Sequence, residues 1–153
     1  MNPADENEYY TNWIYSALHI LGTLQIDLNV DLMAQRLGKP EAVIRSALEF
    51  LKKNKLVEIN SKGIIMATKK NIHLSNQNWM ATIQHKNWRI AALERNQNKG
   101  LQEVRYSGIH SLSHQDLNRL REKIKDFLIT VDDVVRPSKE ETVCFLCLDL
   151  FEI

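Results

Sequence analysis

The sequence has little that could cross-link a fold covalently or carry it through a membrane. Its 153 residues include two cysteines, Cys144 and Cys147, with three prolines and five glycines. Two cysteines so close together cannot build a disulfide framework, which favours a reducing compartment. No apolar run approaches the roughly 20 residues of a membrane span, and the first residues lack the basic and apolar regions of a signal peptide. We therefore expect a cytoplasmic protein that does not bind membranes.

Net charge is also small, and basic residues are missing from one end of the chain. The formal net charge is +1. Residues 1–34 contain five acidic side chains and no Lys or Arg, whereas residues 35–70 contain nine Lys or Arg and three Glu. A total this low is unusual for a DNA-binding protein. Positive charge is nevertheless concentrated in residues 35–70, as a phosphate-binding surface requires.

Signatures of catalysis and metal binding are missing as well. Cys144 and Cys147 have the spacing of half a zinc or redox site, but no second CxxC pair exists. The histidines after residue 70 show no recognised ligand spacing, and no phosphate-binding glycine loop or nucleophile motif is present. We therefore expect no enzyme activity, no catalytic residue, no cofactor and no metal, with both cysteines buried in a structural role.

Residues 30–66 show the order helix, turn, helix and hairpin. Apolar residues three and four apart predict a short helix with Asn29 as its N-cap and Gly38 as its end. Pro40 opens a second helix, because proline suits the first helical position. Two β-rich runs around residues 61–63 then predict a hairpin. This is the order of a winged helix-turn-helix, whose second helix enters the major groove of DNA.

The second helix of this motif leaves a polar side free to bind. Arg45 could make a bidentate contact to guanine, and Glu49 could accept a hydrogen bond from cytosine. Lysines near the helix end and in the hairpin would hold phosphates without reading sequence. The candidate DNA-binding residues are Lys39, Arg45, Ser46, Glu49, Lys52, Lys53, Lys55 and Lys62.

Further elements are predicted on both sides of this motif. Apolar periodicity predicts helices at residues 7–22, 76–97 and 114–132. Alternating patterns predict strands at 101–112 and 142–152, of which the second is apolar on both faces and therefore buried. His19 is expected to be a partly buried helix residue, and Ser113 to be the N-cap of the last helix.

The whole chain is thus predicted to be an α+β protein in two parts. Residues 1–70 would form the winged helix-turn-helix domain. Residues 71–153 would form a long helix followed by a small strand–helix–strand α/β portion for dimerisation or sensing. We expect a homodimer through the helix from Asn76 to Gln97, with one alternative of equal weight: Trp79 and Trp88 fill the chain's own core.

Several short pieces of the sequence, in their order and spacing, resemble one protein family. The pieces are Trp13-Ile-Tyr-Ser-Ala, Met33-Ala-Gln-Arg-Leu, Ala47-Leu-Glu-Phe-Leu, His85-Lys-Asn-Trp-Arg-Ile-Ala, Arg105-Tyr-Ser and Leu148-Asp-Leu-Phe151. The chain resembles an uncharacterised bacterial family of domain-of-unknown-function type. Its members occur in paralogous sets in predatory and fibre-degrading bacteria and are known only as hypothetical or regulatory proteins. The resemblance implies a winged helix joined to a small α/β portion, and it supplies no catalytic residue.

Three functions remain open from the sequence. The pattern and the local charge favour a transcription regulator that binds double-stranded DNA. The alternative is a winged helix that binds a protein partner or acts as a scaffold and never meets DNA, which Glu41, Glu49 and the low net charge favour. Less weight falls on a regulator that senses a small molecule through residues 101–153.

Overall fold

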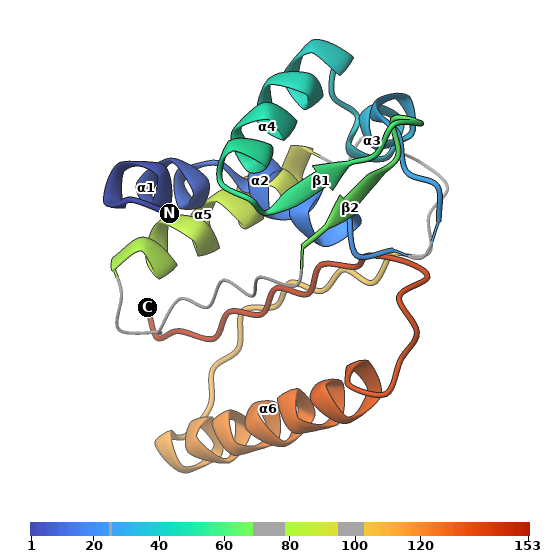
Figure 1. Ribbon diagram of the computed structural model, residues 1–153. Coiled ribbons are helices and arrows are strands. Elements are labelled where there is room, and N and C mark those ends of the chain that lie inside the picture. The colour runs from blue at the N-terminus through green and yellow to red at the C-terminus, as the bar shows by residue number, and fades with distance from the viewer. Residues whose placement is uncertain (25, 69–78, 95–102) are drawn as a thin grey trace. The chain divides into compact units, whose positions relative to one another are not determined.

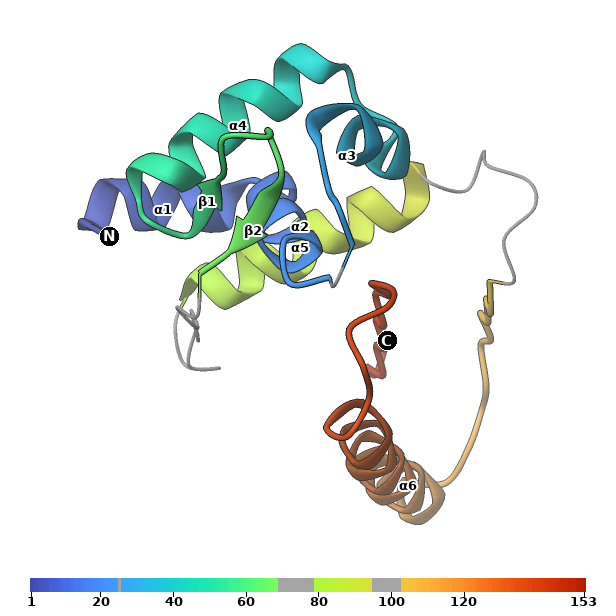
Figure 2. The same ribbon diagram turned by 45° about the vertical axis from the view of Figure 1, so that its right-hand side comes forward.

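The computed structural model is mostly helical, with six helices and one small β-hairpin in the part of the chain that it describes (Figures 1 and 2). The described residues are 1–24, 26–68, 79–94 and 103–153. This confirms the predicted mixture of helices with a small β element. None of the described helices combines the length and the apolarity that a membrane span would need.

Two short helices stand where one helix was expected over residues 7–22. Helix α1 spans Pro3–Thr11 and helix α2 spans Trp13–Leu21. Asn12 separates them with an extended backbone, and its side-chain oxygen accepts a hydrogen bond from the Ile14 N–H at 3.0 Å. The prediction of one continuous helix was wrong because Asn12 acts as the N-cap of a new helix.

The next elements follow the predicted order of helix, turn, helix and hairpin. They are α3 (Val30–Leu37), α4 (Glu41–Lys53), β1 (Val57–Ile59) and β2 (Ile65–Ala67). The Asn29 side chain accepts a hydrogen bond from the Leu32 N–H at 2.9 Å, so the predicted N-cap is confirmed. Gly38 ends α3 in the left-handed conformation with φ of 62°, as predicted. This arrangement is consistent with a winged helix.

The hairpin is joined to the segment between α2 and α3 by main-chain hydrogen bonds. Strands β1 and β2 are antiparallel, with Ile59 opposite Ile65. The Ile65 N–H donates to the Leu28 carbonyl at 2.8 Å, and the Ala67 N–H donates to the Gly22 carbonyl at 2.7 Å. A Cβ atom at Gly22 would lie 2.8 Å from the Ala67 nitrogen, so this close approach requires glycine.

A hydrophobic core lies between the inner faces of α2, α3, α4 and the hairpin. Its most completely buried large side chains are Leu18, Leu28, Met33, Ile44, Leu48, Leu51, Leu56, Val57 and Ile65. Burial of one such side chain contributes roughly 1.5–3 kcal/mol. Because α4 turns Ile44, Leu48 and Leu51 inward, its opposite side is left to solvent.

Helix α5 (Trp79–Glu94) packs against α1 and α2. Its Trp88 ring lies 5.7 Å from the Trp13 ring, centroid to centroid, and stacks on Phe145 at 4.7 Å. Trp88 therefore packs within its own chain, which was one of the two alternatives for this helix.

Asn87 adds a polar link between α5 and α1. Its Nδ2 atom donates a hydrogen bond of 2.6 Å to the carbonyl of Thr11, the last residue of α1. A side-chain donor of this kind satisfies a helix-end carbonyl that has no partner inside its own helix. The helix ends predicted at Asn76 and Gln97 lie outside the described residues.

The chain divides into two compact units. The first contains Met1–Gln97 and Glu140–Cys147, and the second contains Asn98–Lys139 and Leu148–Ile153. The second unit is built around helix α6 (His114–Val135).

Helix α6 begins where the sequence predicted. The Ser113 Oγ atom accepts a hydrogen bond from the Asp116 N–H at 3.1 Å, which confirms the predicted N-cap. The strands predicted on either side of α6 are absent from described residues 103–113 and 139–153. An alternating pattern specifies a face, but a strand also needs a neighbour that completes its hydrogen-bond ladder.

The cysteines also lie elsewhere than expected. We predicted that Cys144 and Cys147 would be buried in a strand, whereas both are exposed. Nearby Phe145 stacks on Trp88, so this segment contacts helix α5 through an aromatic ring and forms no strand in described residues 139–153.

Candidate nucleic-acid interface

The outer side of α4 is the surface that the sequence singled out. Ala42, Ser46, Glu49 and Lys53 follow one another at spacings of four, three and four, so they form one row along the helix. All four are exposed. The row lies opposite the buried stripe of α4, a helix that lies at the surface of the first unit (Figure 1).

An open groove of about 380 Å³ runs between α4, the start of α3 and the hairpin turn. Arg45 and Lys62 reach it from elements that are separate in the sequence, so the structure brings these two predicted cations together. Asp31 and Glu41 line the same groove. Its charge is therefore mixed rather than purely basic.

The hairpin turn holds Lys62 at its tip. The Asn60 Oδ1 atom accepts hydrogen bonds from the Lys62 N–H at 2.9 Å and from the Ile64 N–H at 3.0 Å. Gly63 has φ of 77°, a left-handed conformation that glycine adopts at little cost. These bonds fix the backbone of the turn while the Lys62 side chain stays exposed.

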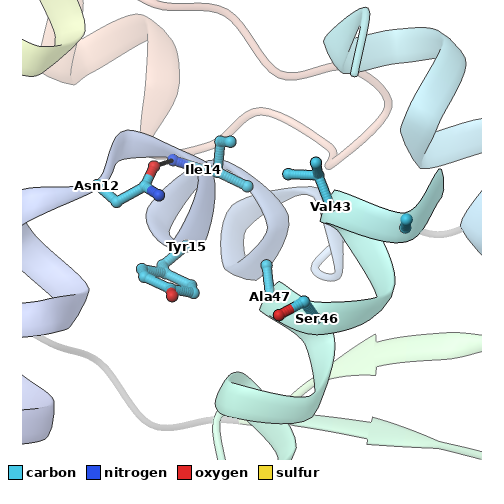
Figure 3. Close-up of a pocket in the computed structure, with 7 residues that line it drawn as sticks. Asn12, Ile14, Tyr15, Val43, Ser46 and Ala47 are labelled. Carbon is cyan, nitrogen blue, oxygen red and sulfur yellow. Dashed lines mark hydrogen bonds between the residues drawn. The ribbon is translucent and has the colours of Figure 1, made fainter. Parts of the chain in front are cut away.

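The other side of α4 borders a second groove of about 360 Å³, which α2 closes (Figure 3). Val43 and Ala47 of α4 line it with Ile14 and Tyr15 of α2, and Ser46 lies at its rim, where it adjoins the outer row. The Tyr15 hydroxyl donates to Glu8 at 2.7 Å, and burial together with this bond raises the pKa of Tyr15 to about 12. This hydroxyl is thus a poor acid, and the groove shows packing and no reactive group among its lining residues.

Helices α3 and α4 end with the same backbone motif but with different residues. At the end of α4 the Leu56 N–H donates to the Leu51 carbonyl at 2.9 Å, and the Lys55 N–H donates to the Lys52 carbonyl at 3.0 Å. The motif requires a left-handed residue, which is Gly38 for α3 and Lys55, with φ of 56°, for α4. A side chain in this conformation costs roughly 1–2 kcal/mol.

Two candidate cations already have acidic neighbours on the surface. The Arg45 guanidinium lies 2.8 Å from Glu41, and the Lys53 ammonium lies 3.1 Å from Asp5. Arg45 and Lys53 are both more than half exposed. The exposed Arg45–Glu41 pair contributes only about 0–1 kcal/mol, so Arg45 can readily exchange Glu41 for a phosphate. Lys53 pairs with an Asp5 side chain that is only 13 % exposed.

Lys39 differs from the other candidates. Its ammonium lies 3.0 Å from the Glu94 carboxylate of α5 and 5.6 Å from the centre of the Trp13 ring of α2. Its side chain is only 28 % exposed. The ion pair and the cation–π contact therefore direct Lys39 toward α2 and α5. Sequence reasoning missed this because Glu94 is 55 residues away.

The remaining basic candidates gather at the end of α4. Lys52 and Lys53 occupy its last turn, Lys55 follows, and all three are exposed. The structure therefore offers two basic positions beside the outer row: this lysine group, and the pair of Arg45 and Lys62 in the groove.

A buried histidine lies in the core, away from this surface. His19 is 6 % exposed, and its Nδ1 atom lies 3.2 Å from the Tyr9 hydroxyl. Burial lowers the pKa of His19, and a hydrogen bond with the backbone of Thr68 partly opposes the shift. His19 is a helix residue as expected, but it is buried more completely than the partial burial that the sequence predicted. Within the described part of the chain, no group of three or more His, Cys, Asp or Glu side chains is placed to hold a metal ion.

Comparison with known protein families matches residues 3–153 to the model described as "Domain of unknown function (DUF4423)". The match agrees with the resemblance to a family of that type over nearly the whole chain. Comparisons with curated proteins and with solved structures gave no match.

Proposed function

Because the chain belongs to the family described as Domain of unknown function (DUF4423), whose description gives no activity, we propose a function from its residues. The protein is a transcription regulator that binds double-stranded DNA through a winged helix made of α3, α4 and the β1–β2 hairpin. In this proposal α4 enters the major groove, α3 braces it, and the hairpin turn contacts the adjacent backbone.

One observation carries the proposal. Helix α4 follows α3 after a short turn, and the β1–β2 hairpin lies beside it. Exposed basic side chains lie at the end of α4 and at the tip of the hairpin. DNA presents two phosphate backbones on either side of a groove, so a reading helix needs cations flanking it. Lys52, Lys53 and Lys55 would supply one flank, and Lys62 the other.

The proposed roles of the remaining candidates follow from their positions. Ser46 and Glu49 lie in the outer row of α4 and would face base edges. Arg45 lies beside that row and could reach guanine after releasing Glu41. Lys39 is assigned a different role, in which its contacts with Glu94 and Trp13 fix the turn between α3 and α4.

The test is a fluorescence-anisotropy titration of the full chain against random duplex DNA at 50 and 200 mM salt. If Lys52, Lys53, Lys55 and Lys62 each neutralise one phosphate, affinity should fall about 150-fold between the two concentrations. The triple variant of Lys52, Lys53 and Lys62 to Ala should retain only about a 3-fold fall, because one contact remains.

The matched control removes the same charge from the second unit. It replaces Lys123, Lys125 and Lys139, all exposed, with Ala. We expect it to bind DNA with nearly the wild-type salt dependence. Absence of wild-type binding at 50 mM salt, or equal losses in both triple variants, would overturn the proposal.

Base readout is tested at Arg45 on a site selected from random DNA. Arg45→Ala should weaken binding to that site by about 1–3 kcal/mol and relax its preference. Glu41→Gln is the control, since it breaks the same ion pair but keeps the guanidinium. Unchanged affinity and preference in Arg45→Ala would remove Arg45 from the readout.

A protein partner in place of DNA is the second candidate function. Glu41 and Glu49 are exposed on α4, and Asp31 lines the groove beside them. Phosphates would repel these carboxylates, whereas a basic protein surface would attract them. If the protein does not bind DNA at low salt, binding to a protein partner becomes the leading proposal.

A further inference from the structure

Helix α6 carries an apolar stripe that is only partly covered, with intermediate exposure at Leu117, Leu120, Ile124 and Val131. In the described residues of the second unit, no side chain is buried. Phe127 is 45 % exposed and Val134 is 67 % exposed. At 22 residues the helix is roughly 33 Å long, and a helix with this much open apolar surface is marginal in water by itself.

The stripe repeats every seven residues. The first positions of the repeat and the fourth positions are all apolar, over three successive repeats. The first positions are Leu117, Ile124 and Val131, and the fourth positions are Leu120, Phe127 and Val134. Apolar side chains that repeat strictly every seven residues stay in contact with one partner helix along a coiled coil. In a helix that packs on a globular core, the apolar side chains instead follow the 3.6-residue period.

Two features favour a second copy of this chain as the partner. Ile124 and Val131 are β-branched residues at first positions of the repeat, which suits parallel two-stranded pairing. Asp116 precedes the first apolar position, and Arg121 follows the fourth. In a parallel pair, Asp116 of each copy lies opposite Arg121 of the other copy. The dimer would therefore contain two equivalent ion pairs between the chains.

We propose that α6 pairs with α6 of a second copy as a parallel two-stranded coiled coil. Such a contact is self-complementary and closes at two chains. The proposal does not depend on DNA binding. Helix α5 is the weaker choice for this role because its Trp88 already packs on Trp13 and Phe145 of its own chain.

Sedimentation equilibrium of the full chain between 1 and 100 µM, without DNA, tests the proposal. We expect the wild type to be a dimer. Ile124→Glu should raise the dissociation constant about 100-fold or more, since two carboxylates would be buried face to face. Ile129→Glu is the matched control, because Ile129 is 61 % exposed and lies outside the seven-residue stripe.

Folding of the variants is read separately. All three tryptophans of the sequence belong to the first unit, so their fluorescence reports on that unit alone. We expect the same fluorescence in the wild type and both Glu variants. A wild type that is monomeric at 100 µM would overturn the proposal. So would a dimer that survives Ile124→Glu unchanged, which would place the interface elsewhere, such as on α5.

Disulfide formation tests the parallel direction. In a chain with Cys144→Ser and Cys147→Ser, Leu120→Cys places one thiol at a fourth position, where it meets its own copy only in a parallel pair. Oxidation should cross-link most of this variant. Gln115→Cys, on the outer side of the pair, should cross-link little. A dimer in which neither variant cross-links preferentially would overturn the parallel arrangement.

Discussion

Helices α4 and α6 both carry regular apolar stripes, but only the stripe of α4 is fully buried. Ile44 and Leu51 of α4 are fully buried by α2, α3 and the hairpin. Phe127 and Val134 of α6 remain about half exposed or more. An apolar stripe therefore determines that a helix will form and which side it will bury, but the partner comes from the rest of the fold.

The same contrast separates the two units. Stability of the first unit rests on many side chains that share one core, so removal of any one affects the others. The second unit has no buried side chain among its described residues, so its stability rests on the helix itself and on whatever covers α6.

The largest expected effect distinguishes these two sources of stability. Leu51→Ala should lower the free energy of unfolding of the first unit by about 2–5 kcal/mol, because it leaves a cavity in a closed core. Ile129→Ala in α6 should change it by less than about 0.5 kcal/mol. Urea unfolding followed by tryptophan fluorescence measures both. Equal losses would contradict this comparison, because they would require Ile129 to be buried as completely as Leu51.

Local signals explain why the ends of α3 and the start of α6 were predictable. The caps at Asn29, Gly38 and Ser113 each depend on residues within a few positions, and all three are confirmed. Asn12 was misread because an asparagine fits both a helix interior and an N-cap. Only its hydrogen bond to Ile14 decides between them.

Contacts between distant residues explain most of what the sequence could not reveal. The sequence predicts that Lys39 is an exposed cation beside a proline, yet the position of its side chain depends on Glu94 of another helix. Lys55 carries no signal of its left-handed backbone, which follows from burial of Leu56 and the end of α4. The expected strands failed for a related reason, since pairing depends on a neighbour that the pattern does not name.

Acid should lower the free energy of unfolding of the first unit in particular. The clear pKa shifts of Tyr9, Tyr10, Tyr15 and His19 all belong to the first unit. Burial lowers the pKa of His19 from its usual 6.5, so between the folded-state pKa and 6.5 the unfolded state binds more protons than the folded state. Stability that is present above pH 6.5 is therefore lost as the pH falls toward the folded pKa, by up to about 1.4 kcal/mol per pH unit.

The measurement is urea unfolding between pH 7.5 and 5 for the wild type and His19→Gln. The variant should start less stable, because it loses the bond to Tyr9, but its stability should fall less steeply with acid. His114→Gln, at the exposed start of α6, should keep the wild-type slope. Parallel slopes for the wild type and His19→Gln would show that His19 is not the group responsible.

The smallest expected effect concerns the ends of α3 and α4. Lys55→Gly should stabilise the first unit by about 0.5–1 kcal/mol, since glycine adopts φ of 56° without strain but loses more freedom on folding. Gly38→Ala should destabilise it by about 1 kcal/mol at the matching position of α3. Thermal unfolding would measure both changes.

Lys55→Gly also separates stability from function. If Lys55 holds a phosphate, the variant should be more stable and yet lose about one unit of slope in the plot of log affinity against log salt. The strained backbone of Lys55 would then be explained by its contact with a phosphate, because glycine at this position would be more stable. A variant with higher stability and an unchanged salt slope would remove Lys55 from the DNA surface, and leave Lys52 and Lys53 as the cations at that end of α4.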